Sequence, residues 1–403
     1  MNQSFQRQQL IRFCKKAEYI DYGLTFKQLS DSLDACYEKI ANDSFEFSLK
    51  KVNEYFLSND LPNKLILRKL NDNIKRIYKV EQANRRIIIS QVKTLLSETC
   101  PFWVIKTDIK NFYESIDRQE IITKFHYDSM LTYQSMFILK KLFDNPVLLG
   151  LSGLPRGLNI SATMSELYMR KFDNWIRSYE NVYFYARFVD DMIIFLNSLR
   201  DSLNLINNLN PQLNSLAKGL SINDEKTELF DGRTLENLDK KTGYKIPQKK
   251  KLDYLGYSFR IENGKTNNRK LIVSIAEKKI KKIKSRIIKA FLDFSKNKNF
   301  DLLEKRIQFL TGNYIIRKSK VGNSLRAGIY YNYLQVTSHS AFIELNIFLR
   351  KTIFSKNTNF GARIGLNEIQ KERLRKYCFL AGFEKKIYID FSFSDLQQIK
   401  KCW

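Results

Sequence analysis

Hydrophobic and polar positions along the chain follow two different periods. Apolar residues recur at helical spacing over residues 26–40 and 45–56, within a polar segment that covers residues 1–70, and both stretches are predicted to be amphipathic helices. Helical patterning returns from about residue 275. Between them, three runs of aromatic and β-branched residues are typical of strands, at 102–107, 182–188 and 192–196.

A further helical pattern lies between the first two strand-like runs. It follows Gly153 and Gly157, which allow the backbone a close approach to a base pair or a sugar. The apolar stripe of this helix is predicted to be core: Met164, Leu167, Tyr168, Phe172, Trp175, Ile176 and Tyr179.

Acidic residues stand at the ends of the strand-like runs. Asp108 follows the first run and precedes a helix-like stretch at 109–117, where capping that helix is the alternative role for this aspartate. Asp190 and Asp191 form the tight turn between the other two runs. Adjacent carboxylates among bulky apolar residues repel each other unless a cation offsets their charge. The hairpin therefore predicts a metal site, in which Asp108 and Asp190 could hold two Mg²⁺ ions about 4 Å apart.

Composition narrows the choice of metal and partner. The chain has 403 residues, with 69 Lys and Arg against 42 Asp and Glu, so its net charge is +27. This excess favours a nucleic-acid partner over an anionic membrane surface, with a merely solubilising charge as the alternative. Two histidines and five scattered cysteines make a zinc site or a disulfide framework unexpected. A metal held by carboxylates is expected to be Mg²⁺, with Mn²⁺ possible.

The length predicts more than one structural unit, because single cores rarely grow beyond about 250–300 residues. We expect a helical N-terminal extension at 1–70, a middle part at 71–260 and a helical C-terminal part at 261–403. The last part contains seven Lys or Arg from Lys278 to Lys289 on a helix with one isoleucine face. A second basic patch, 317–320, precedes the aromatic residues 330–333. Neither a signal peptide nor a transmembrane stretch is found, so a cytoplasmic location is expected.

The order of these motifs resembles the palm of reverse transcriptases, from about residue 79 to 259. Asp108 lies in Thr-Asp-Ile-Lys-Asn-Phe-Tyr, which resembles the family's first palm motif. Residues 188–191 (Phe-Val-Asp-Asp) resemble its aromatic-x-Asp-Asp box. Three further segments resemble its Leu-Pro-Gln-Gly box, the motif that follows the Asp-Asp box, and the primer-grip hairpin: 153–161, 219–227 and 252–257. The resemblance implies an α+β right-hand polymerase with fingers, a palm built on an antiparallel sheet, and a helical thumb.

The resemblance also implies roles for individual residues. The implied metal ligands are Asp108, Ile109, Asp190 and Asp191. Lys226 would assist departure of pyrophosphate, as a proton donor or a charge stabiliser. Tyr113 would exclude the ribose 2′-hydroxyl, although helix core beside Phe112 is compatible with the same position. The implied contacts to the nucleotide and its phosphates are Arg85 and Arg86 at the start of a strand-like run, Tyr113, Arg156, Gly157 and Phe188. For Arg86 a plain basic surface is the alternative.

Departures from the family pattern narrow the subgroup. Arg156 replaces the usual Gln, with Glu166 as an alternative structural partner, and Phe188 replaces the usual Tyr. The elements usual in retrons, and a maturase-like or nuclease extension, are not found. The remaining resemblance is to bacterial defence-associated and abortive-infection reverse transcriptases.

The expected function is RNA-directed DNA synthesis from dNTPs in antiphage defence. The expected partners are an RNA template, which could be a dedicated non-coding RNA, the DNA product, and a partner protein or second copy of the chain, with no membrane. The alternatives are template-independent or protein-primed DNA synthesis, RNA synthesis, which Tyr113 opposes, and an inert RNA-binding scaffold.

Overall fold

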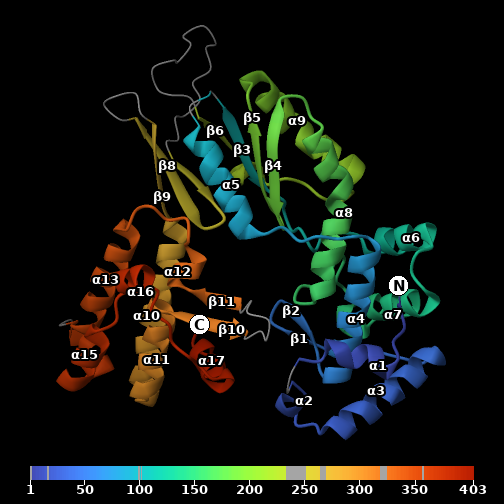
Figure 1. The fold of residues 1–403 in the computed structure, drawn as a ribbon, viewed down its shortest axis with the longest axis horizontal. Helices are drawn as coiled ribbons and strands as arrows, with labels where there is room; N and C mark the ends of the chain where they lie inside the picture. Colours follow the sequence, from blue (N-terminus) through green and yellow to red (C-terminus); the bar gives the residue numbers. More distant parts are fainter. Residues whose placement is uncertain are drawn as a thin grey trace. The chain divides into compact units, whose positions relative to one another are not determined.

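The computed structural model describes residues 2–15, 18–98, 100, 102–232, 251–263, 269–317, 325–355 and 358–403. These residues fall into two compact units, which Figure 1 shows as a ribbon. The first unit comprises Met1–Ile88 and Pro101–Arg233, and the second comprises Ile89–Cys100 and Thr234–Trp403. Helix α5 (Arg85–Ser97) runs across this division. The three-part division at residues 70 and 260 stays a prediction.

The first unit is built on a four-stranded antiparallel sheet in the order β4-β5-β3-β6. The strands are β3 (Trp103–Asp108), β4 (Val182–Phe188), β5 (Asp191–Leu196) and β6 (Glu228–Asp231). The three strand-like runs of the sequence are therefore confirmed as strands. Residues Met192 to Leu196 of β5 are all fully buried, as expected of a strand in the interior of a covered sheet.

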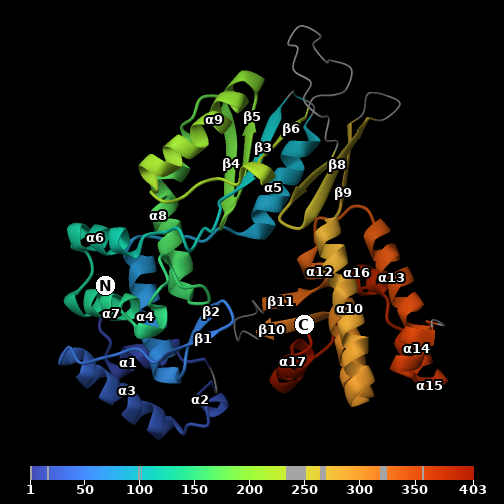
Figure 2. The same cartoon turned by 180° about the vertical axis from the view of Figure 1, so that it is seen from behind.

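Two long helices pack on this sheet, α8 (Asn159–Arg177) against β4 and α9 (Leu199–Leu216) against β3 and β5 (Figures 1 and 2). Met164, Phe172 and Ile176 of α8 are fully buried, so the predicted core stripe is confirmed for these residues. The buried Leu205, Leu209 and Leu213 of α9 recur every fourth residue and form its sheet-facing side.

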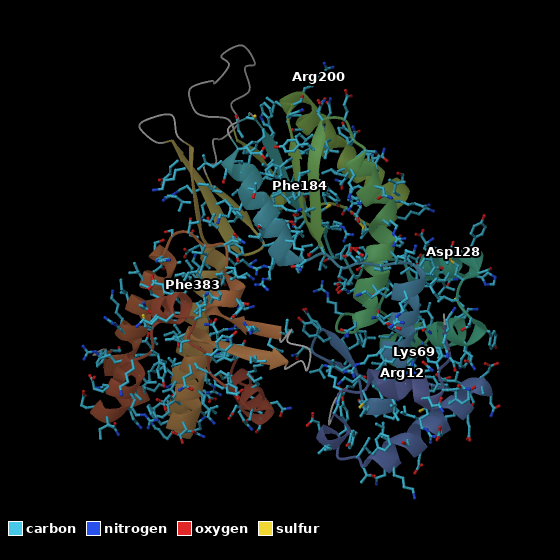
Figure 3. All side chains as sticks on the ribbon, viewed as in Figure 1. Arg12, Lys69, Asp128, Phe184, Arg200 and Phe383 are labelled. Atoms are coloured by element: carbon cyan, nitrogen blue, oxygen red, sulfur yellow. The ribbon has the colours of Figure 1, made fainter. Side chains whose placement is uncertain are left out.

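Further helices, most of them from the first 77 residues, complete the first unit. The predicted helix at 26–40 is confirmed as α3, which begins after Thr25, whose side chain accepts a hydrogen bond from the Gln28 amide. Lys69 of α4 is buried near the chain start, where its ammonium donates to the Asn2 carbonyl at 2.7 Å (Figure 3). The helices here are α1 (Arg7–Leu10), α2 (Glu18–Asp21), α3 (Phe26–Ala41), α4 (Leu61–Ile77), α6 (Arg118–Asp128) and α7 (Tyr133–Phe143).

The predicted helix at 45–56 is wrong, because this segment forms a hairpin of β1 (Leu49–Val52) and β2 (Tyr55–Ser58). The physical reason is the period of burial. Phe45, Phe47 and Leu49 are buried while the residues between them are exposed, which is the alternation of a strand. Asn53, with φ of 55°, supplies the positive angle that a two-residue hairpin turn needs.

The strand predicted at 85–89 is also wrong, since Arg85 begins helix α5. A run of three isoleucines resembles a strand locally. The burial of Ile88, Ile89, Val92 and Leu96 nevertheless follows one helical face, while Ile87 is exposed. Longer-range periodicity therefore decides the structure of this segment.

The second unit contains a three-stranded antiparallel sheet, β7 (Lys251–Tyr254), β8 (Tyr257–Asn263) and β9 (Arg269–Ile275), and a hairpin of β10 (Asn313–Arg317) and β11 (Leu325–Gly328). The predicted hairpin at 252–257 is confirmed. Its turn residues, Leu255 and Gly256, both have positive φ angles.

The predicted basic helix is confirmed as α10 (Glu277–Asn297), with Ile280 and Ile287 buried and most of its lysines exposed. Of the second basic patch, Lys318, Ser319 and Lys320 lie outside the described residues. Phe383, labelled in Figure 3, stacks on Phe342 with ring centroids 4.4 Å apart. Further helices of this unit are α11 (Phe300–Thr311), α12 (Ile329–Asn332), α13 (Ser340–Ile353), α14 (Thr358–Ile364), α15 (Glu368–Arg375), α16 (Phe379–Glu384) and α17 (Phe393–Lys400). Across the described part of the chain, no helix is both long and apolar enough to span a bilayer.

Candidate active site

Three aspartates, Asp108, Asp190 and Asp191, lie at one end of the two inner strands of the four-stranded sheet, a place that we call the aspartate edge. Asp108 ends β3, Asp191 begins β5, and the antiparallel register places them opposite each other. Such directly opposed residues have Cβ atoms about 4.5–5.5 Å apart. Asp190 occupies the two-residue turn between β4 and β5, and its carbonyl accepts a hydrogen bond from the Ile109 amide at 3.2 Å. The structure therefore brings Asp108, Ile109, Asp190 and Asp191 together, while their role as metal ligands stays a prediction.

The carboxylates at this edge are electrostatically unfavourable to one another. Burial, and then repulsion from Asp190 and Asp108, raises the pKa of Asp191 to about 6. Burial also raises the pKa of Asp190, with a contribution from Asp108, against the effects of its own backbone amide and nearby cations. Negative charge is thus concentrated in a partly desolvated place, where a divalent cation would offset it.

Lys226 reaches this edge from the segment that follows α9. The segment is fixed by two main-chain hydrogen bonds, from the Asn223 amide to the Asp108 carbonyl at 2.8 Å and from the Lys110 amide to the Ser221 carbonyl at 2.9 Å. Lys226 ends a short 3₁₀ helix, Asp224–Lys226, and its ammonium contacts Oδ2 of Asp108 at 2.7 Å. The hydrogen bond to Asp108 raises the pKa of Lys226, which keeps the ammonium protonated.

The helix predicted at 109–117 is wrong. Ile109 forms an antiparallel β-bridge with Ile222, and Asn111 has a φ of 42°, which does not fit a right-handed helix. Residues 110–115 instead form turns. The cap of the following helix α6 is Asp117, whose carboxylate accepts from the Gln119 amide at 2.7 Å. The alternative in which Asp108 caps a helix is therefore excluded.

The donor set suits a hard divalent cation such as Mg²⁺. All the side-chain donors are carboxylate oxygens, and Oδ1 of Asp108 is buried with no hydrogen-bond partner. Within the described ranges, however, no three acidic, histidine or cysteine side chains are grouped closely enough to share one ion. The ammonium of Lys226 already offsets the negative charge of Asp108. The carboxylates of Asp108, Asp190 and Asp191 also repel one another, which favours a wider spacing. The chemistry of these carboxylate donors is compatible with Mg²⁺, and the metal site itself stays a prediction.

Tyr113 lies in the turn segment beside the aspartates and is half-buried. Its ring is 5.4 Å from that of Phe112, and burial raises the pKa of its phenol. Its carbonyl accepts from the Leu154 amide at 2.7 Å. A Cβ on Gly153 would lie 2.2 Å from the Tyr113 carbonyl oxygen, so the loop can approach only with glycine at this position. The 153–157 loop therefore packs directly on the segment that carries Tyr113.

Arg156 forms a bidentate ion pair with Glu114, in which Nε bonds Oε1 and Nη2 bonds Oε2, the latter at 3.0 Å. The predicted acidic alternative for Arg156 is right in kind but wrong in residue, because Glu166 pairs with Arg187 instead. Gly157 has φ of 98°, and a Cβ there would lie 2.7 Å from the Phe56 carbonyl oxygen. The close approach that Gly157 permits is therefore to strand β2 of the protein itself.

Replacing Arg156 with Gln is expected to change the products more than the stability. Arg156 and Glu114 have side chains 38% and 33% exposed, so losing their pair should cost no more than about 1 kcal/mol of unfolding free energy. If Arg156 contacts a triphosphate or a nucleic-acid phosphate, wild-type DNA should have restricted composition and the variant's should be mixed. Sequencing both products, with Glu114→Gln as the control that frees Arg156, measures this. Mixed composition from all three proteins would make the pair purely structural.

For the other predicted nucleotide contacts, Phe188, Arg85 and Arg86, the structure gives the position in a strand or helix. Phe188 is the last residue of β4 and is paired with Asp191 in the sheet register. Arg85 and Arg86 occupy the first turn of α5 instead of a strand. The phosphate-binding role of both arginines stays a prediction.

Sequence reasoning overlooked Arg187, which stands one residue before Phe188. Its side chain is 3% exposed and pairs with both Glu166 and Asp173 of α8. The available signal was the presence of an arginine inside a run of aromatic residues, because a buried arginine is almost always paired.

Solved telomerase structures are similar to this chain at low sequence identity, 11–14%. No curated protein gives a match. Among solved structures, telomerase from Candida albicans in complex with a TWJ fragment of telomeric RNA is 12% identical, with a TM-score of 0.39, covering 96% of this chain and 59% of that one. Apo telomerase from Candida tropicalis is 11% identical, with a TM-score of 0.35, covering 91% and 61%. The chain spans between 51% and 61% of the length of the telomerase chains that it matches.

A family model gives the broader assignment. The model described as reverse transcriptase (RNA-dependent DNA polymerase) matches residues 45–259, which is more than half of the 403 residues. That range begins just before the β1–β2 hairpin, includes the aspartates and Lys226, and ends within β8. The chain therefore belongs to the reverse transcriptase family of RNA-dependent DNA polymerases.

Proposed function

We propose that the protein is an RNA-directed DNA polymerase that joins dNTPs by metal-dependent nucleotidyl transfer, with the aspartate edge as its active site. The observation that carries this proposal is the register that sets Asp108 opposite Asp191, with Asp190 in the adjoining turn and Lys226 on Asp108. In the reaction a 3′-hydroxyl attacks the α-phosphorus of a dNTP, and the bond from that phosphorus to pyrophosphate breaks.

Each residue has a defined task in this proposal. Asp108, Asp190 and Asp191 would hold Mg²⁺, or Mn²⁺, with Ile109 alongside. Two such ions, when bound, activate the attacking hydroxyl and neutralise charge on the triphosphate. The Lys226 ammonium donates a proton, or offers its charge, to the departing pyrophosphate. Tyr113 presents an aromatic ring where a 2′-hydroxyl would lie, and Arg85 binds phosphate oxygens.

Incubation with labelled nucleotides, one type at a time, tests the proposal. With an RNA template, dNTPs are expected to give a product that DNase degrades and RNase does not, whereas rNTPs are expected to give none. A product from rNTPs alone would indicate an RNA polymerase. Equal synthesis without template would indicate template-independent synthesis, and a product that stays attached to the protein until protease treatment would indicate protein priming. No product from a well-folded protein would favour an inert RNA-binding scaffold.

Replacing Tyr113 with Ala is expected to raise the use of rNTPs relative to dNTPs. The collision between an aromatic ring and a 2′-hydroxyl is steric, so its relief should alter the ratio of the two kcat/KM values more than dNTP use alone. Single-nucleotide incorporation assays with both substrates measure that ratio. Phe112→Ala is a control, because the neighbouring ring is fully buried core. A ratio that stays constant in an active Tyr113→Ala protein would leave Tyr113 as core only.

The biological role we propose is antiphage defence in the bacterial cytoplasm, with an RNA template, a DNA product, and a partner protein or a second copy of the chain. It rests on the resemblance to defence-associated and abortive-infection reverse transcriptases, and the exposed lysines of α10 support a nucleic-acid partner. Phage challenge of bacteria that express wild type or Asp190→Asn tests the role. Equal protection, or none from either, would contradict it.

A further inference from the structure

We propose that Arg187 is a positioning residue, which fixes the turn carrying Asp190 to helix α8. The proposal rests on the function proposed above, since it concerns how the aspartate edge is held in shape. It assigns a task to a buried cluster that neither the sequence motifs nor the proposed chemistry uses.

Every N–H group of the Arg187 guanidinium has an acceptor. Nε and Nη2 donate to the two carboxylate oxygens of Asp173, at 2.9 and 2.7 Å. Nη1 and Nη2 donate to the two oxygens of Glu166, at 3.2 and 2.8 Å. The remaining Nη1 bond, at 2.8 Å, goes to the main-chain carbonyl of Val189. One guanidinium therefore ties α8 to the turn before Asp190 by five hydrogen bonds.

The cluster is buried and carries more negative than positive charge. Asp173 and Glu166 together face one guanidinium, and the Tyr185 hydroxyl supplies a further bond to Asp173 at 2.7 Å. Burial raises the pKa of Glu166, although Arg187 acts against that shift. Desolvating three charged groups costs much of what their attraction returns, so a buried ion cluster is a weak source of stability. The main physical effect of the cluster is to hold the turn at Val189 in a fixed position relative to α8.

The turn that the cluster holds is strained. Val189 has φ of 63°, which is a genuine outlier for a β-branched residue because its Cβ crowds the backbone. Strain of this kind persists only where surrounding contacts hold it. Here Arg187 holds the Val189 carbonyl, and the Ile109 amide holds the next carbonyl, that of Asp190, at 3.2 Å. The Asp190 turn is thus fixed to the Arg187 cluster on α8 and to Ile109, the residue that follows β3.

The expected consequence is a loss of catalytic rate when this hold is weakened. Arg187→Lys keeps the charge but replaces a planar fork of five donors with one ammonium, which cannot reach both carboxylates and the carbonyl. A misplacement of about 1 Å at a reacting group costs roughly 100-fold in rate. We expect kcat to fall by about that factor with little change in the KM for dNTP, and Mn²⁺ binding, followed by electron paramagnetic resonance, to weaken.

A second substitution separates positioning from simple stability. Glycine adopts positive φ without strain, so Val189→Gly in the Arg187→Lys background should let the turn keep its shape unaided. We expect this double variant to recover at least part of the lost kcat and Mn²⁺ affinity, measured at a temperature at which all the variants are fully folded. Arg177→Lys is the matched control, because Arg177 is an exposed arginine of α8 whose guanidinium donates a hydrogen bond to Asn174 in the same helix.

The outcomes distinguish this proposal from the proposed function. Wild-type kcat and Mn²⁺ affinity in Arg187→Lys would overturn the positioning role, as would losses that follow the folded fraction and are not rescued by Val189→Gly. Should Arg187→Lys not fold, Glu166→Gln, which keeps an acceptor and lowers the negative charge, takes its place with the same readouts. If wild type binds Mn²⁺ but makes no polymer, the proposed function fails while the Mn²⁺ measurements still decide the role of Arg187.

Discussion

Replacing Asp190 with Asn is expected to lower DNA synthesis by about 10³-fold or more, because the amide keeps the shape of the side chain but removes the charge that would bind a cation. The free energy of unfolding is not expected to fall. The pKa of Asp190 is raised by burial and by Asp108, so its ionised form is less stable in the folded protein than in the unfolded chain. At neutral pH, removing the charge should therefore leave the melting temperature unchanged or slightly higher.

Initial rates with labelled dNTPs and melting curves of both proteins measure this contrast. Asp224→Asn is the matched control, since Asp224 lies in the nearby 3₁₀ helix, has a side chain 71% exposed, and pairs with Lys110 at 3.7 Å. It should retain activity close to that of wild type. Normal synthesis by a folded Asp190→Asn protein would remove Asp190 from the active site.

The strands of the sheet and their acidic ends could be predicted from the sequence because their signals are local. Aromatic and β-branched runs stand on both sides of Asp190 and Asp191, and pairing them as a hairpin needs no distant information. The α+β polymerase fold predicted by resemblance is confirmed by the family match and by the mixed helix and antiparallel sheet. The identities of the metal and of the nucleotide contacts stay predictions.

Other features depend on contacts between distant segments. The segment 109–117 has a helical pattern in the sequence, but it forms turns in the structure, where Ile109 forms a β-bridge with Ile222 and the Tyr113 carbonyl accepts a hydrogen bond from the Leu154 amide. The sequence suggested Glu166 as the acidic partner of Arg156, whereas packing of the 153–157 loop on the segment of Tyr113 places Arg156 beside Glu114. The β1–β2 hairpin is different, because the alternation of Phe45, Phe47 and Leu49 was visible, and a strand period should have been preferred to a helical one.

Replacing Lys226 with Ala is expected to lower the rate of nucleotide addition by about 10²-fold or more, the usual scale for loss of a positioned acid. Its effect on metal binding should be opposite to that of Asp190→Asn. The Lys226 ammonium contacts Asp108 at 2.7 Å and competes there with a cation. Without it, negative charge at the aspartate edge is less opposed, so half-maximal activity should need an equal or lower Mg²⁺ concentration.

A third protein, Lys226→Arg, separates the two roles that remain open for this lysine. A guanidinium keeps the positive charge but does not release a proton near neutral pH. If Lys226 donates a proton to pyrophosphate, the arginine protein should be as slow as the alanine protein. If Lys226 acts only through its charge, arginine should restore much of the rate. Lys110→Ala is the control, since Lys110 pairs with Asp224 instead of an aspartate of the active site. A wild-type rate in Lys226→Ala, measured over a full Mg²⁺ titration, would exclude both roles.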